Sequence, residues 1–307
     1  MQLRKRKLTD IAAQATAGSG AGDGVADDDP PTPPQPAAAS GLRATPRHVA
    51  APIPISFAAA AAAADGLALA AAAAPVALST PDELRHAVAH LRAADPVLAR
   101  LIDAQGDALP ERLLLKNGDC FHALARSIVY QQLSTKAAST IMGRVLAACG
   151  CAGGVALTPA ALRRADEASL RAAGLSARKA SYLQSLAVHH DAGTVTAAAV
   201  TALADDAAIT ALTQVKGIGV WTAHMFLMFQ LGRPDVLPVG DLGVRQGMRA
   251  AYGLKAPPGP EEMEAVAERW RPYRSVGAWY MWRALEGAQV MNKGNGSSTK
   301  RIKQSKA

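Results

Sequence analysis

Apolar positions in residues 81–288 recur every three or four residues, and glycine, proline or aspartate stands between most of the runs. This spacing places the apolar side chains on one face of a helix. Alanine and leucine prevail, and the β-branched runs of period two that mark strands do not occur there. The pattern predicts an all-α fold, an irregular cluster of short helices. These are expected at residues 82–93, 96–105, 119–130, 135–148, 159–165, 166–172, 177–191, 205–213, 221–231, 242–252, 261–269 and 275–288.

The first of these helices has a clear start signal. Ser79 or Thr80 stands before Pro81, Asp82 and Glu83, which supply a cap, a first-turn proline and first-turn acids. The folded domain is therefore expected to span residues 80–288.

The chain before this domain has a different composition. Residues 1–79 contain a proline-rich run at 30–36 and an alanine run at 58–64, with Phe57 as their one aromatic residue. Such a segment cannot enclose a packed core, so we predict that it is a disordered, low-complexity region. Residues 289–307 are predicted to form a flexible basic tail.

Neither a membrane segment nor a membrane partner is predicted. The apolar window at residues 58–74 is dominated by alanine and is interrupted by Asp65 and Gly66. It is too short and too weakly apolar to span a bilayer.

A basic cluster, RKRK, occupies residues 4–7. Acidic residues follow soon after it, at Asp23 and at 27–29, and transit peptides are usually poor in acids. The cluster therefore favours nuclear import over an organelle signal, and an ordinary solvated basic terminus is the alternative.

The net charge of +8 is concentrated outside the predicted domain. Residues 1–80 carry six basic and six acidic side chains, and residues 289–307 carry five basic ones and no acid, which leaves +3 for the remainder. Net charge alone thus does not identify a nucleic-acid-binding protein. The three cysteines, Cys120, Cys149 and Cys151, lack metal-site spacing and are interpreted as reduced thiols.

The stretch VKGIGVWTA, at residues 215–223, lies between two predicted helices and predicts a helix, hairpin, helix unit. Gly217 and Gly219 are expected to take positive φ and to let a phosphate approach the main chain, with free N–H groups at the following helix start directed at the anion. The alternative is a helix C-cap glycine followed by a turn glycine, which needs no ligand.

The hairpin resembles that of the helix-hairpin-helix DNA glycosylase superfamily, which grips the DNA backbone. The matching positions are Ile209, Leu212, Val215, Gly217, Ile218, Gly219, Thr222 and Ala223. Lys216 stands where the family often has proline. In the superfamily an essential aspartate follows the hairpin at the start of a helix, and Asp241, in the run PVGD 22 residues beyond Gly219, matches it. Asp241 is also interpretable as a simple helix N-cap.

The resemblance implies that the Asp241 carboxylate is catalytic, and the chemistry of the reaction supports this role. Breaking an N-glycosidic bond builds positive charge on the sugar, and a nearby ionised carboxylate stabilises it. Asp241 is therefore the predicted catalytic residue, which also orients or deprotonates the attacking water.

Two departures from motifs found elsewhere in the superfamily indicate which branch of it the chain resembles. Trp221 occupies the position at which strand-cutting members carry a lysine nucleophile, and no cysteine follows Cys151, so the iron–sulfur branch is excluded. The segments VYQQLSTKAA at 129–138 and WRPYRSVGAWYMWR at 270–283 resemble the 3-methyladenine DNA glycosylase II group. This resemblance implies two helical lobes with a cleft between them and a monofunctional glycosylase without a cofactor.

The group's substrates, alkylated purines such as 3-methyladenine and 7-methylguanine, are cationic and stack on aromatic faces. Trp221 is the main expected contact, and further candidates for the pocket wall are Tyr130, Tyr273, Tyr280 and Trp282. A buried aromatic on a helix is more often plain core, and this is the alternative interpretation of each of these further candidates. A glycosylase for deaminated or oxidised bases, or a non-catalytic DNA-binding module, stays open as an alternative function.

The resemblance also implies contacts with double-stranded DNA that contains damaged bases. Gln132 or Leu133 would fill the space left by a flipped nucleotide. Ser134 and Lys136 would hold a phosphate at the next helix start, although Ser134 is also interpretable as a cap. The expected hairpin contacts are Lys216, Gly217, Gly219 and Thr222.

The family's hairpin often binds a monovalent cation through main-chain carbonyls, which here would belong to Thr213, Val215 and Gly217. No helical stripe is left over for an interface between copies, so the protein is expected to be a monomer.

Overall fold

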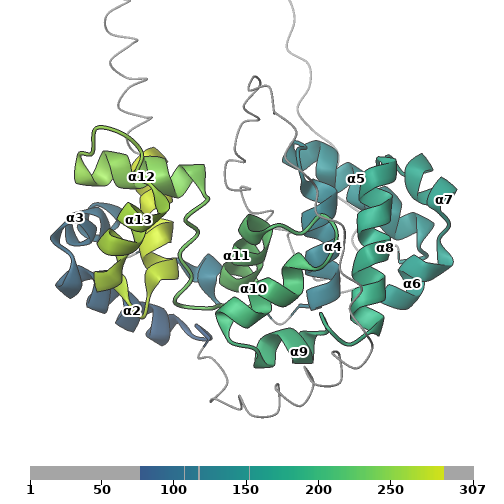
Figure 1. Cartoon of the computed structure of the whole chain (residues 1–307), viewed down its shortest axis with the longest axis horizontal. Coiled ribbons are helices and arrows are strands. Elements are labelled where there is room, and N and C mark those ends of the chain that lie inside the picture. The colour runs from purple at the N-terminus through teal and green to yellow at the C-terminus, as the bar shows by residue number, and fades with distance from the viewer. Residues whose placement is uncertain (1–76, 107, 117, 152, 287–307) are drawn as a thin grey trace, which may run out of the picture. The chain divides into compact units, whose positions relative to one another are not determined.

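A computed structural model of the chain describes residues 77–106, 108–116, 118–151 and 153–286. Within these ranges the structure contains helices and no strand, which confirms the all-α prediction (Figure 1). None of the helices in the described ranges is both long and apolar enough to cross a bilayer. The predicted basic cluster, the disordered region up to residue 76 and the basic tail lie outside the described residues.

The helices follow the predicted order with small shifts at their ends. They are α2 (Pro81–Ala94), α3 (Pro96–Gln105), α4 (Cys120–Tyr130), α5 (Thr135–Ala148), α6 (Pro159–Arg164), α7 (Glu167–Ala172), α8 (Ala177–Asp191), α9 (Ala197–Ala202), α10 (Asp205–Thr213), α11 (Val220–Phe229), α12 (Leu242–Tyr252) and α13 (Pro260–Ala267). Two 3₁₀ turns, η1 (Glu111–Leu113) and η2 (Glu268–Trp270), and a last helix over 274–286 complete the described chain.

Most of the helices begin at a serine, threonine or aspartate whose side chain accepts a hydrogen bond from the first turn. Asp119, for example, accepts from the N–H of His122 and lies just before α4 rather than inside it. These caps satisfy amide groups that have no partner within the helix. In the described part of the chain α10, α11 and α13 lack such a side-chain cap.

Two sequence predictions differ from the structure. Leu78, assigned to the low-complexity region, is buried, and its N–H donates to the carbonyl of Gly232. The packed chain therefore begins before residue 80. Helix α9 was not predicted, because its six residues are too few to show a helical period; the Thr196 side chain caps it and Val200 anchors it in the core.

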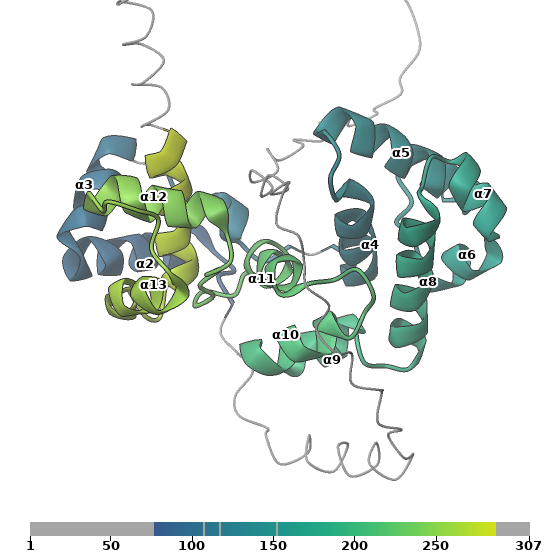
Figure 2. The same cartoon turned by 45° about the horizontal axis from the view of Figure 1, so that its top comes forward.

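The helices form two groups, which agrees with the two helical lobes expected. Helices α4 to α8 lie together, and α2, α3, α12 and α13 lie together (Figures 1 and 2). The second group unites segments from the start and the end of the described chain. The buried apolar side chains form one hydrophobic cluster that includes residues of both groups.

Asp95 links the distant segments of this second group. Its carboxylate caps α3 by accepting from the N–H groups of Val97 and Leu98, and it also accepts from the Tyr252 hydroxyl at 2.6 Å and the Trp270 indole N–H at 3.0 Å. The side chain has no exposed surface. Burial alone would raise the pKa of Asp95, but the hydrogen bonds from Tyr252 and Trp270 outweigh it and lower the pKa.

We therefore expect Asp95→Ala to lower the free energy of unfolding by about 3 kcal/mol, because it strips two buried donors of their acceptor. Urea unfolding followed by circular dichroism measures this change. Asp166→Ala is the matched control, since Asp166 caps α7 from an exposed position through a single backbone N–H. Equal losses in the two variants would contradict a special role for the Asp95 network.

Candidate active site and nucleic-acid interface

Asp241 lies at the N-terminus of α12, as predicted, and caps that helix by accepting from the N–H of Val244 at 2.8 Å. Two indole N–H groups also donate to its carboxylate, that of Trp221 to Oδ2 at 2.7 Å and that of Trp282 to Oδ1 at 2.9 Å. The Asp241 side chain has no exposed surface. Three donors thus surround an acceptor-only group, and among the described residues no lysine or arginine forms an ion pair with it.

Close backbone packing brings Trp282 to Asp241. A Cβ atom placed on Gly247 would lie 1.9 Å from the carbonyl oxygen of Met281, so only glycine lets α12 approach the last helix this closely. One turn earlier, a Cβ on Gly243 would lie 2.8 Å from the Trp282 indole. The two glycines therefore set the distance between the carboxylate and one of its donors.

The aromatic surroundings of the carboxylate extend to Phe229, whose ring centroid lies 5.8 Å from that of Trp282. The Arg112 guanidinium lies over the Phe229 ring, 5.7 Å from its centroid. Burial and the nearby charge of Arg283 lower the pKa of Arg112. Trp221 and Phe229 are half-buried, so this cluster reaches the surface.

Other aromatic candidates have partners of their own. Tyr280 is 1% exposed and packs edge-on against Trp279, and burial raises its pKa to about 12. This burial agrees with the alternative interpretation of Tyr280 as plain core, and its substrate role stays a prediction. Tyr130 stacks with Arg126 at 4.1 Å, and Tyr273 packs against two histidines of α2.

The two glycines of the hairpin between α10 and α11 have different backbone conformations. Gly217 has φ +86°, as expected, and a Cβ there would lie 2.1 Å from the Tyr182 ring. Gly219 has φ −93°, so its predicted positive φ is wrong; it is the extended N-cap residue of α11. A Cβ on Gly219 would meet nothing within 4 Å, and no side chain caps α11. The start of α11 therefore offers open backbone N–H groups.

Lys216 and Thr222, which are also predicted to contact DNA, differ in their exposure to solvent. Lys216 is exposed, and its backbone N–H donates to the Ser185 hydroxyl at 3.1 Å. Thr222 is 8% exposed, which does not fit a DNA contact through its side chain, because one turn into α11 it faces the core.

Two of the three carbonyls of the predicted cation site, those of Val215 and Gly217, already have hydrogen-bond partners. The Val215 carbonyl accepts from the Ile218 N–H at 3.0 Å, and the Gly217 carbonyl accepts from the Gln131 side-chain amide at 2.7 Å. Because a carbonyl oxygen has two lone pairs, these bonds leave each oxygen a further acceptor site for a monovalent ion. The described residues contain no group of three or more His, Cys, Asp or Glu side chains that could hold a metal.

The loop over residues 131–133, which we call the wedge loop, joins α4 to α5. Gln132 is exposed and has φ +58°, a conformation that is uncommon for a residue other than glycine and that concentrates at functional sites. Ser134 caps α5 by accepting from the Ala137 N–H, and Lys136 is exposed one turn later. The cap interpretation of Ser134 is therefore confirmed.

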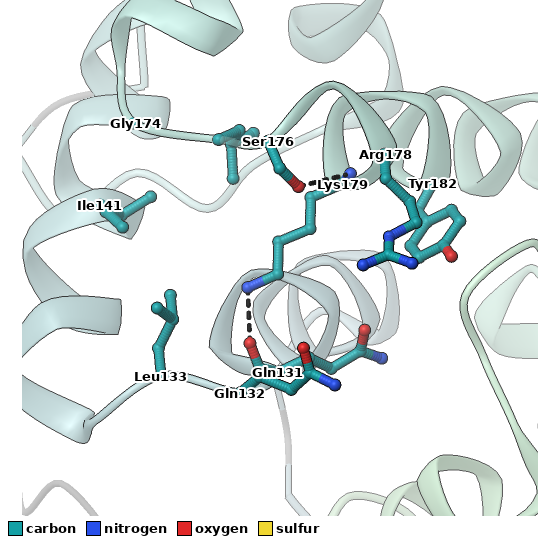
Figure 3. Close-up of a pocket in the computed structure, with 10 residues that line it drawn as sticks. Gln131, Gln132, Leu133, Ile141, Gly174, Ser176, Arg178, Lys179 and Tyr182 are labelled. Atoms are coloured by element: carbon teal, nitrogen blue, oxygen red, sulfur yellow. Dashed lines mark hydrogen bonds between the residues drawn. The ribbon is translucent and has the colours of Figure 1, made fainter. Parts of the chain in front are cut away.

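A pocket of about 400 Å³ lies beside the wedge loop (Figure 3). Its lining combines the loop itself with Ile141 of α5 and the beginning of α8. The residues from the α8 side are Gly174, Leu175, Ser176, Arg178, Lys179 and Tyr182. This contribution of α8 was not predicted from the sequence, because the serine, lysine and tyrosine of α8 have no distinctive spacing for a helix.

Comparison with known proteins agrees with this geometry. Residues 125–272 match the HhH-GPD superfamily of base excision DNA repair proteins. The DNA-3-methyladenine glycosylase 1 of Schizosaccharomyces pombe is 35% identical over 201 residues, which cover 65% of this chain and 87% of that protein. The chain therefore belongs to the HhH-GPD superfamily of base excision DNA repair proteins.

Solved structures are similar as well. A 3-methyladenine DNA glycosylase of S. pombe in complex with abasic DNA is 34% identical, with a TM-score of 0.56, over 64% of this chain and 95% of that one. A DNA-3-methyladenine glycosidase from Bacillus halodurans is also 34% identical, with a TM-score of 0.59, over 68% of this chain and 91% of that one.

The hairpin geometry generates a paired prediction. Gly217→Ala should lower the free energy of unfolding by at least about 2 kcal/mol, because it forces a side chain into positive φ and against Tyr182. Gly219→Ala should leave stability nearly unchanged, since its φ suits alanine and its surroundings are open. Thermal unfolding of both variants measures the difference, and a large loss in Gly219→Ala would show that the hairpin is packed differently.

Proposed function

We propose that this protein is a monofunctional DNA glycosylase that removes alkylated purines from double-stranded DNA. The observation that supports this most strongly is the buried carboxylate of Asp241, held by the indoles of Trp221 and Trp282 at the start of α12. The similarity to proteins named 3-methyladenine DNA glycosylases supports the substrate class.

The reaction requires a fixed negative charge beside the sugar. As the damaged base leaves, positive charge develops on the sugar ring, and the ionised carboxylate of Asp241 stabilises it. The N-terminus of α12 and the three N–H donors keep this oxygen pair in place. The same carboxylate then orients the attacking water or accepts its proton.

Access to the carboxylate requires a local change. Since Asp241 has no exposed surface, an entering nucleotide must displace part of its cover. Trp221 covers Oδ2 and is itself half-buried, so we propose that this indole shifts and stacks on the flipped base. An electron-rich ring face suits a cationic alkylated purine.

No strand cleavage is proposed, because Trp221 stands where a Schiff-base lysine would be needed. Alkylated purines are good leaving groups, so a single carboxylate and an aromatic pocket are sufficient for their release. The product is then an intact strand with an abasic site.

We assign the DNA contacts to backbone N–H groups that lack a side-chain cap and to side chains at the surface. The uncapped start of α11 at Gly219 binds a phosphate, with Lys216 beside it. Gln132 and Leu133 enter the duplex where the nucleotide has left, and Lys136 contacts a phosphate. The protein acts as a monomer, since its large exposed apolar residues, such as Val155, Val188 and Val220, lie singly on separate elements.

Asp241→Asn tests the catalytic role. We expect single-turnover release of 7-methylguanine from methylated duplex DNA to fall by roughly a hundredfold or more, since the neutral amide cannot stabilise the developing charge. DNA affinity, measured by fluorescence anisotropy, should survive. The amide also turns one donor toward the indoles, so thermal unfolding serves as the control for folding. Full activity in a folded variant would reject the mechanism.

A lesion panel tests the substrate class. Duplex oligonucleotides with 7-methylguanine should yield abasic sites that break only after alkali, whereas those with hypoxanthine or 8-oxoguanine should react much more slowly. A preference for either of these neutral bases would support a different lesion. The absence of alkali-labile sites on every substrate, with DNA binding retained, would support a non-catalytic DNA-binding module.

A further inference from the structure

Lys179, near the start of α8, has an unusual pair of partners for a lysine. Its ammonium donates to the carbonyl of Val129 at 2.6 Å. It also donates to the carbonyl of Gln131 at 2.7 Å (Figure 3). The side chain is half-buried, and burial lowers its pKa. No carboxylate pairs with it in the described chain, so its charge is directed entirely at main-chain oxygens.

These oxygens lie where α4 ends and the wedge loop begins. The last carbonyls of a helix lack intrahelical partners and carry the negative end of the helix dipole, so a cation there both satisfies and stabilises them. Two backbone hydrogen bonds of the turn are longer: the Gln131 N–H donates to the Ile128 carbonyl at 3.4 Å, and the Leu133 N–H donates to the Tyr130 carbonyl at 3.3 Å. The lysine therefore supplies the shorter contacts.

The loop needs such support because of its backbone. Gln132 has φ +58°, which is unfavourable for a residue with a Cβ atom and persists only when the surroundings impose it. Lys179 fixes the carbonyl immediately before Gln132. Losing this contact frees the turn to relax to an ordinary conformation, which redirects the Gln132 side chain.

The same side of α8 also contacts the hairpin. Tyr182, three residues after Lys179, packs on Gly217, and Ser185, three residues further, accepts the Lys216 N–H. The wedge loop also contacts the hairpin directly, because the Gln131 side-chain amide donates to the Gly217 carbonyl. One helix side thus holds both segments to which the proposed function assigns DNA contacts.

We propose that Lys179 is a positioning residue that holds the wedge loop in the shape required to enter the duplex, and so favours extrusion of the nucleotide rather than bond cleavage. This inference rests on the proposed function. It assigns Lys179 no contact with the substrate or with Asp241.

Base extrusion and bond cleavage are separable experimentally. In duplex DNA the damaged base must leave the stack, whereas in a single strand it is already accessible and the wedge loop has little to replace. Lys179→Met keeps the length of the side chain and removes its charge. We expect its single-turnover rate of 7-methylguanine release at saturating protein to fall roughly tenfold to a hundredfold on duplex DNA, the range for hydrogen bonds from a charged donor. The rate on the same strand alone should change little.

Two variants serve as controls. Lys179→Arg, which keeps the charge and its donors, should restore much of the duplex rate. Arg178→Met removes a positive charge from the neighbouring exposed residue, which forms no hydrogen bond to the loop carbonyls, so it should slow both substrates to a similar degree. If Lys179→Met does not fold, Lys179→Gln, which keeps one amide donor, replaces it.

The outcomes separate this inference from the proposed function. Equal losses on duplex and single-stranded DNA, or the same duplex-specific loss in Arg178→Met, would overturn the role of Lys179. If the unmodified protein released no base from either substrate, the proposed function would fail. The inference is then decided by binding: Lys179→Met should lose the preference for a duplex with an abasic-site analogue over an intact duplex, and an unchanged preference would refute it.

Discussion

The site depends on a buried carboxylate that has hydrogen-bond donors but no cationic partner among the residues that the structure describes. An ionised group without solvent costs several kcal/mol unless donors replace the water, and Asp241 obtains three from three segments of the chain. The backbone of α12, the indole at the start of α11 and the indole of the last helix must all converge on it. This requirement explains why Gly247 allows so close a helix crossing. It also keeps the carboxylate to which we assign the catalytic role away from water.

A second constraint concerns the surface to which we assign the DNA contacts. The wedge loop and the hairpin are separated by about 80 residues of sequence, and both are short turns with unusual backbone. Short turns of this kind do not hold their own shape, because they bury little apolar surface. Helix α8 provides a rigid support through Lys179, Tyr182 and Ser185. Rigid placement of both turns is what a protein needs in order to bind a phosphate on one side and unstack a base on the other.

Much of this arrangement could be predicted from the sequence, and the exceptions have physical causes. The hairpin and Asp241 were found because turn glycines and a helix-capping aspartate are local features with strong motifs. Trp282 was found only as one candidate among several aromatics, since helical spacing does not say which ring faces a carboxylate. Tyr280, two residues earlier, faces the core instead. The positive φ expected at Gly219 was wrong because its glycine leaves room at a helix start rather than forming the turn.

The helical fold, most of its elements and the family are evident in the amino-acid sequence, because hydrophobic period, caps and turn residues act over a few positions. The side-chain contacts are evident only in the folded protein: the Trp221 and Trp282 indoles share one carboxylate, and a lysine of α8 binds a loop 48 residues away. Those contacts depend on how helices cross, and crossing is set by packing between residues that are distant along the chain.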